Sequence, residues 1–103
     1  MAEADWYNVD TTGKGFCIYS NKISARRLCK LISSIGVKWC NSPLKFRTGG
    51  ESIFEIDGTQ FKIGHIWSDY TIDPCSELAN ENVVKKLNDL FRNVQPRWWW
   101  AWI

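Results

Sequence analysis

The sequence has few of the residues that catalytic and metal sites usually require. Its 103 residues include one histidine, His65, and four cysteines. The cysteines are separated by 12, 11 and 35 positions, whereas zinc ligands usually come in closely spaced pairs. The glycine-rich phosphate-binding motifs and the H-E-x-x-H motif are missing as well. We therefore expect neither a metal nor a cofactor.

Long hydrophobic runs are also missing. Residues 1–10 carry three acids and no apolar run of signal-peptide type, and nowhere do eighteen apolar residues follow one another. We expect an intracellular, cytoplasmic protein with no membrane partner, whose cysteines are reduced. We interpret Cys17, Cys29 and Cys40 as small core residues, and Cys75 as the cysteine that can be exposed.

Carboxylates are absent from one long stretch of the chain. Between Thr11 and Gly50 there are eight lysines and arginines and no acid, which gives a net charge of +8. Between Glu51 and Glu81 seven acids face the single base Lys62, which gives −6. This segregation predicts a dipolar molecule that can steer its encounter with a charged partner. The alternative is that the two stretches lie side by side and partly neutralise each other.

The first half of the chain predicts a strand, a helix and a second strand. Alternating residues from Gly15 to Ser20 indicate the first strand. Asn21 or Ser24 can cap a helix that Gly36 ends, with one apolar face formed by Ala25, Leu28, Cys29, Ile32 and Ile35. Strand alternation resumes over residues 37–40, and residues 41–50 are expected to form an exposed loop.

The second half predicts a hairpin and a final helix. Residues 52–57 and 59–64 alternate around Asp57-Gly58, a pair typical of two-residue turns. Residues 65–70 either extend the second strand or begin another, and residues 72–77, with Pro74, are expected to be irregular. A helix should run from Asn80 or Glu81 to about Arg92.

Together these elements predict an α+β fold with two helices. We expect one domain over residues 1–103, with a small, mostly antiparallel sheet of three to five strands in the order β-α-β-β-β-α. We expect residues 1–12 to form an N-terminal segment that can be mobile. Residues 97–103, which follow Pro96, form a separate tryptophan-rich element.

Tryptophan is the residue present in excess. Seven of the 103 residues are tryptophan, and four of these lie among the last six residues. So apolar a C-terminal element must dock on its own fold, pair with a second copy or enter a partner interface, because tryptophan buries a large apolar area. This element consists of Arg97, Trp98, Trp99, Trp100, Trp102 and the neighbouring Ala101 and Ile103.

Two further patterns keep other classes of function open. Arg26, Arg27 and Lys30 on the exposed helix face, with Lys45-Phe46-Arg47 in the loop and Trp39 nearby, could bind phosphates and stack bases. His65, with Asp69 four positions later and Asp73 eight positions later, could act as a general base in a small hydrolase. The alternatives are a solvated helix face and a structural histidine.

Residues 16–70 contain an aromatic-rich strand, an apolar-spaced helix, Ile-Gly-Val-Lys-Trp at 35–39, a polar loop and the hairpin Ser-Ile-Phe-Glu-Ile-Asp-Gly. In this order of motifs the chain resembles small accessory proteins of tailed bacteriophages. The resemblance implies a compact α+β module without catalytic residues, acting in the cytoplasm of an infected bacterial host. Many accessory phage proteins of this size block a host protein or a bacterial defence system. The chain after Tyr70 departs from this pattern.

We therefore expect a non-enzymatic binding protein, an inhibitor of a bacterial host or defence complex that acts by direct contact. A homodimer is a further possibility, and the alternative function is a nucleic-acid or nucleotide binding module. The expected contact residues are the basic helix face, the loop and the tail: Arg26, Arg27, Lys30, Lys45, Phe46, Arg47, Arg97, Trp98, Trp99, Trp100 and Trp102.

Overall fold

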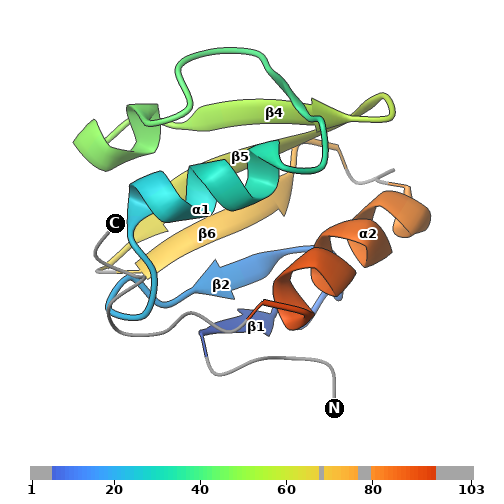
Figure 1. Cartoon of the computed structure of the whole chain (residues 1–103), viewed down its shortest axis with the longest axis horizontal. Coiled ribbons are helices and arrows are strands. Elements are labelled where there is room, and N and C mark those ends of the chain that lie inside the picture. The colour runs from blue at the N-terminus through green and yellow to red at the C-terminus, as the bar shows by residue number, and fades with distance from the viewer. Residues whose placement is uncertain (1–5, 68, 77–79, 95–103) are drawn as a thin grey trace.

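A six-stranded antiparallel sheet forms the framework of residues 6–67, 69–76 and 80–94, the part of the chain that the computed structural model describes (Figure 1). The order of the strands across the sheet is β1-β2-β6-β5-β4-β3. Every neighbouring pair is antiparallel. The strands are β1 (Tyr7–Val9), β2 (Phe16–Ile18), β3 (Lys38–Trp39), β4 (Ser52–Ile56), β5 (Thr59–Ile66) and β6 (Asp69–Pro74).

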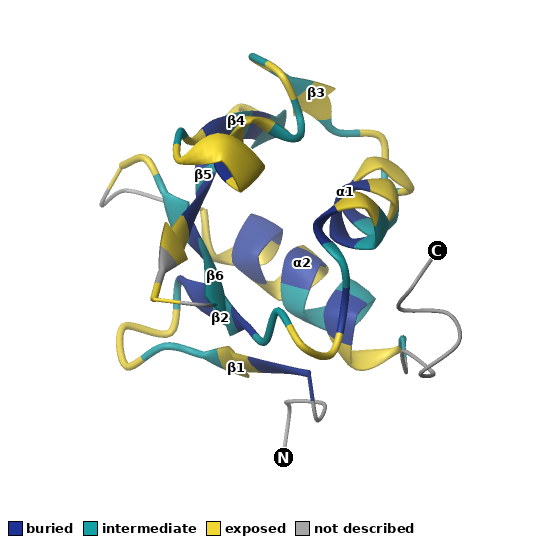
Figure 2. Ribbon diagram, turned by 90° about the vertical axis from the view of Figure 1, so that its left-hand side faces the viewer, coloured by how far each residue is buried: buried dark blue, intermediate teal, exposed yellow. Residues whose placement is uncertain are grey.

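Two helices pack on the same face of this sheet. They are α1 (Ala25–Ser33) and α2 (Glu81–Arg92), and Figure 2 shows both on one side of the strands. A short 3-10 helix, η1 (Lys45–Thr48), lies in the connection between β3 and β4. The helix-facing side chains of the strands are buried, among them Phe16, Ile18, Phe54, Phe61, Ile63 and Ile72. The opposite face of the sheet is left uncovered by the two helices and carries polar residues.

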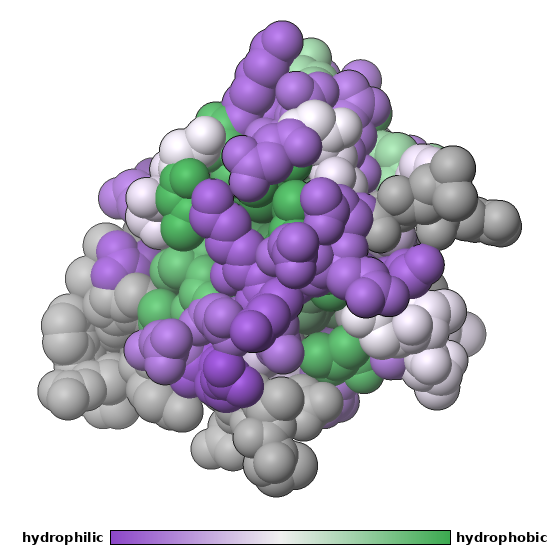
Figure 3. Space-filling model, turned by 90° about the vertical axis from the view of Figure 1, so that its right-hand side faces the viewer, coloured by the Kyte–Doolittle hydropathy of each residue, from purple (hydrophilic) through white to green (hydrophobic). Residues whose placement is uncertain are grey.

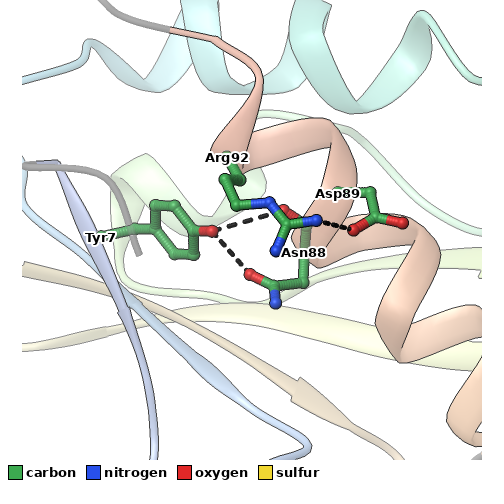
Figure 4. A network of polar contacts seen from close by, with 4 residues as sticks. All are labelled: Tyr7, Asn88, Asp89 and Arg92. Atoms are coloured by element: carbon green, nitrogen blue, oxygen red, sulfur yellow. Dashed lines mark hydrogen bonds and ion pairs between the residues drawn. The ribbon is translucent and has the colours of Figure 1, made fainter. Parts of the chain in front are cut away.

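The strand β1 is fixed to α2 by its aromatic side chains. The Tyr7 hydroxyl donates a hydrogen bond to the Asn88 side-chain oxygen at 2.5 Å (Figure 4). The indole Nε1 of Trp6 donates to the carbonyl of Val94 at 2.9 Å. Both rings are buried and lie edge-on to Phe91, with ring centroids 5.3 and 5.5 Å away. These contacts join residues more than 80 positions apart in the sequence.

Several predicted elements are confirmed. The α+β class and the two helices are present, and α1 begins after the predicted cap Ser24. The helix α2 runs from Glu81 to Arg92, as its pattern predicts. At the β4–β5 turn Asp57 and Gly58 have φ values of 49° and 83°, the left-handed conformation expected of a two-residue hairpin turn.

The predicted count of three to five strands is wrong, because β1 was not expected and β6 was expected only in part. The strand β1 lies within residues 1–12, for which no element was expected. The strand β6 begins in the run 65–70, which was expected to extend the second hairpin strand or begin another, but it continues into residues expected to be irregular. It is an interior strand of the sheet between β2 and β5. Its Pro74 is the last residue of the strand, where a missing N–H does not interrupt the ladder.

Candidate functional site

A basic surface lies where α1 approaches the loop that carries η1. We define it as Arg26, Arg27 and Lys30 of α1 together with Lys45 and Arg47 of η1. The Cys29 thiol of α1 donates a hydrogen bond to the carbonyl of Pro43, two residues before η1, at 3.1 Å. Figure 2 looks onto the end of the molecule where η1 and the start of α1 lie. The fold therefore brings together the two basic segments that the sequence analysis selected.

Local structure explains why these side chains point outward. The Ser24 hydroxyl accepts a hydrogen bond from the backbone N–H of Arg27 at 3.1 Å, which sets the start of α1. Its apolar face, Ala25, Leu28, Cys29 and Ile32, is then buried, and Arg26 and Lys30 remain exposed. In η1 the backbone N–H of Phe46 donates to the buried Ser52 hydroxyl at 3.2 Å. This contact leaves Lys45 and Arg47, on either side of Phe46, exposed.

Four of the five basic side chains of this surface take part in no ion pair of the described residues. Within the described parts of the chain the ion pairs are Lys86 with Asp57 and Arg92 with Asp89, and neither involves Arg26, Lys30, Lys45 or Arg47. Burial raises the pKa of the Tyr70 hydroxyl, and the nearby Arg47 lowers it by a smaller amount. An unbalanced cluster of this kind attracts acidic partners.

Two aromatic residues expected at this surface are unavailable for base stacking. The sequence analysis places Phe46 in an exposed loop as a contact residue, whereas the structure buries its ring completely. That ring lies edge-on to Tyr70, with centroids 5.1 Å apart. Trp39 is only partly exposed, packs against Phe54 at 5.5 Å and donates from Nε1 to the Ser33 hydroxyl at 2.9 Å. Neither Phe46 nor Trp39 therefore offers the free ring face that stacks on the bases of a single-stranded nucleic acid.

His65 is exposed but is not arranged with the two predicted carboxylates. Its ring lies 5.0 Å from the Tyr70 ring and 6.0 Å from the Phe46 ring. Among the described residues no hydrogen bond joins it to Asp69 or Asp73, and an Asp69 side-chain oxygen accepts from the Ser20 backbone N–H instead, at 3.4 Å. The base-and-carboxylate pair of the hydrolase hypothesis is therefore not assembled.

Some of the cysteines lie where the sequence predicts, and one does not. Cys29 is buried as expected, and burial raises the pKa of its thiol to about 11 in spite of the nearby Arg47. Cys40 was expected in the core but is exposed. Cys75 is exposed as expected, and partial burial raises the pKa of its thiol, with Glu51 contributing in the same direction. Neither Cys29 nor Cys75 has the lowered pKa of a reactive thiolate.

Several acidic side chains lie on the uncovered face of the sheet. Asp10 and Asp73 converge over Gly15, where an added Cβ would lie 2.3 and 2.5 Å from their carboxylate oxygens. Beside them is a hollow of about 840 Å³ whose lining includes Glu51, Lys62 and Asp73. No group of three or more histidine, cysteine or acidic side chains within the described ranges could hold a metal ion.

A smaller hollow of about 380 Å³ lies at the opposite end of the molecule from η1. Its lining includes Val9, Phe16 and Val84 and the charged residues Lys85 and Glu81. Figure 3 faces this end and shows mostly hydrophilic side chains with small hydrophobic areas between them. None of the predicted contact residues lines this hollow.

Trp67 is a feature that the sequence analysis missed. It lies in the turn between β5 and β6, its side chain is 97% exposed, and its φ is 55°. The residues around it lack the Asn-Gly or Asp-Gly signature of a hairpin turn, so the pattern gave no turn there. In the sequence, Trp67 stands just before a new run of alternating residues. This change of pattern is the signal that could have revealed the turn.

The predicted tail residues Arg97, Trp98, Trp99, Trp100 and Trp102 lie outside the described residues. No helix in the described ranges is long and apolar enough to cross a membrane. No protein-family model, curated protein or solved structure matches the chain. The arrangement of its own side chains is therefore the basis on which its function can be argued.

Proposed function

We propose that this chain is a non-enzymatic binding protein that recognises an acidic protein surface through its basic surface. The single observation that carries this proposal is the clustering of Arg26, Lys30, Lys45 and Arg47 on α1 and η1, exposed and without ion-paired carboxylates in the described ranges. Maintaining several like charges together destabilises a fold slightly through repulsion. A partner that supplies carboxylates compensates for this repulsion.

The two aromatic residues expected to stack on bases give no support to a nucleic-acid partner. Single-stranded nucleic acids are usually held by aromatic rings that stack on bases, and here Phe46 is buried while Trp39 packs on Phe54. The resemblance to bacteriophage accessory proteins adds the expectation that the partner is a bacterial host or defence protein and that binding inhibits it. Nucleic-acid binding stays the alternative outcome of the test.

Charge reversal on the basic surface tests this function. The variant Arg26→Glu/Lys30→Glu/Arg47→Glu should recover at least about tenfold less partner from bacterial lysate than the wild type, measured by quantitative mass spectrometry. The control Lys85→Glu carries a reversal on α2, away from this surface, and should bind as the wild type does. Nuclease treatment of the lysate separates a protein partner from a nucleic acid.

Equal recovery by the wild type and the triple variant would contradict the proposed site. Recovery that disappears after nuclease treatment would favour the nucleic-acid alternative. Because all three reversed side chains are exposed, we expect the triple variant to fold. Circular dichroism of each variant checks that loss of folding is not the cause of lost binding.

A further inference from the structure

We infer that Trp67 is the apolar anchor of the partner interface, inserted into a pocket on the same acidic partner. This inference rests on the proposed function and names the contact that supplies affinity beside the basic surface. In the chain alone, neither the backbone nor the side chain of Trp67 is favourably placed. Trp67 adopts a left-handed backbone conformation, with φ of 55°, which is unfavourable for a bulky side chain. Its side chain is nevertheless 97% exposed, so the fold gains almost no burial in return.

The neighbouring β4–β5 hairpin shows which residues suit such a turn when stability alone decides. Both β4–β5 and β5–β6 are closed by two residues, between the pairs Ile56↔Thr59 and Ile66↔Asp69. The first turn uses Asp57-Gly58, the residues that tolerate positive φ best. The second has Trp67 at the position equivalent to Asp57. A residue that contradicts local preference without a packing gain is a candidate for function.

The surroundings of the turn connect it to the basic surface. Tyr70, three residues after Trp67, lies against Phe46 of η1 and within electrostatic reach of Arg47. On the other side, the hydrogen bond from the Ser20 N–H to Asp69 brings the loop before α1 next to this turn, and that loop carries the exposed Lys22. In Figure 2 the turn after β5 lies on the same end of the molecule as η1.

This arrangement has the composition of a binding hot spot. A tryptophan that enters a desolvated pocket contributes strongly to affinity, and surrounding charges determine which partner is accepted. The partner that fits is a protein whose apolar pocket is bordered by carboxylates. The pocket receives the Trp67 indole, and the carboxylates face Arg47, Lys22 and the first turn of α1.

The variant Trp67→Asn separates a binding role from a structural one. Asparagine tolerates positive φ, so the melting temperature should stay the same or rise by a few degrees. Recovery of the partner from bacterial lysate should fall at least about tenfold. The matched variant Trp67→Phe keeps an aromatic ring and should retain more binding than Trp67→Asn.

The possible outcomes are distinguishable from those of the proposed function. If Trp67→Asn recovers as much partner as the wild type while the triple charge reversal loses it, the basic surface is the site and the anchor inference is wrong. A marked fall in melting temperature for Trp67→Asn would show that the indole supports the fold, which also overturns the inference. If the wild type itself recovers no specific partner, the proposed function and the anchor fail together.

Discussion

Asp73 is a residue whose ionisation opposes folding. Burial raises the pKa of its carboxyl, and the nearby Asp10 raises it further. The folded state therefore holds this proton more tightly than the unfolded chain does. The protonated Asp73 carboxyl therefore contributes to stability in full below the ordinary carboxyl pKa. This contribution is lost as the pH rises through the pKa that Asp73 has in the folded state.

The variant Asp73→Asn should therefore stabilise the protein at neutral pH. It keeps the shape of the side chain and removes the repulsion from Asp10, so we expect a small rise in melting temperature at pH 7, small because the carboxyl is partly exposed. The gain should vanish below about pH 3.5, where the wild-type carboxyl is protonated. A gain of the same size at both pH values would show that charge is not its cause.

At the scale of single residues, periodicity predicts exposure better inside helices than in loops. The 3.6-residue pattern of α1 correctly places Arg26 and Lys30 on its outer face. The same reasoning fails for Phe46, because burial of a loop residue depends on the distant Tyr70 and Ser52 that it meets. Trp67 was missed as well, since its exposure follows from the turn between two strands.

Among the elements, η1 depends most on a single side chain. Phe46 is fully buried against Tyr70, and its backbone N–H is held by Ser52. Phe46→Ala should lower the free energy of unfolding by about 3–5 kcal/mol, as for other buried phenylalanines, and it should release Lys45 and Arg47 from their positions. Chemical denaturation measures the first effect, and recovery of the partner measures the second.

The variant Phe46→Leu provides the control for this prediction. It keeps most of the buried volume, so it should cost less stability than Phe46→Ala and should retain partner binding. If Phe46→Ala unfolds at the wild-type denaturant concentration, the ring does not hold η1 in the way described. Binding by a stable Phe46→Ala variant equal to that of the wild type would remove η1 from the site.

Elements with a local cause were predictable, and elements with a distant cause were not. The β4–β5 hairpin follows from Asp57-Gly58, and α1 follows from its cap and apolar spacing. The strand β1 has only three residues and is held by contacts to α2 at the other end of the chain. The strand β6 does alternate, with Tyr70 and Ile72 facing the helices between polar residues, but Pro74 made its second half resemble a loop.

At the scale of the whole molecule, charge is distributed by face as well as by sequence. The basic surface lies on α1 and η1, whereas Asp10 and Asp73 converge on the uncovered face of the sheet. The separation is incomplete, because Lys45 and Lys62 line the same hollow as Glu51 and Asp73. The sequence predicted unequal stretches of charge, and only the fold determines which charges share a surface. On the basis of this distribution, we propose that the basic surface and the neighbouring Trp67 form the contact region.

Hydrogen–deuterium exchange of the protein alone and with the partner recovered by the wild type tests this account most directly. If the basic surface and Trp67 make the contact, binding should protect backbone amides in residues 25–33, 45–48 and 65–70 and leave α2 unchanged. Protection confined to α2 or to the uncovered face of the sheet would contradict the proposed binding site.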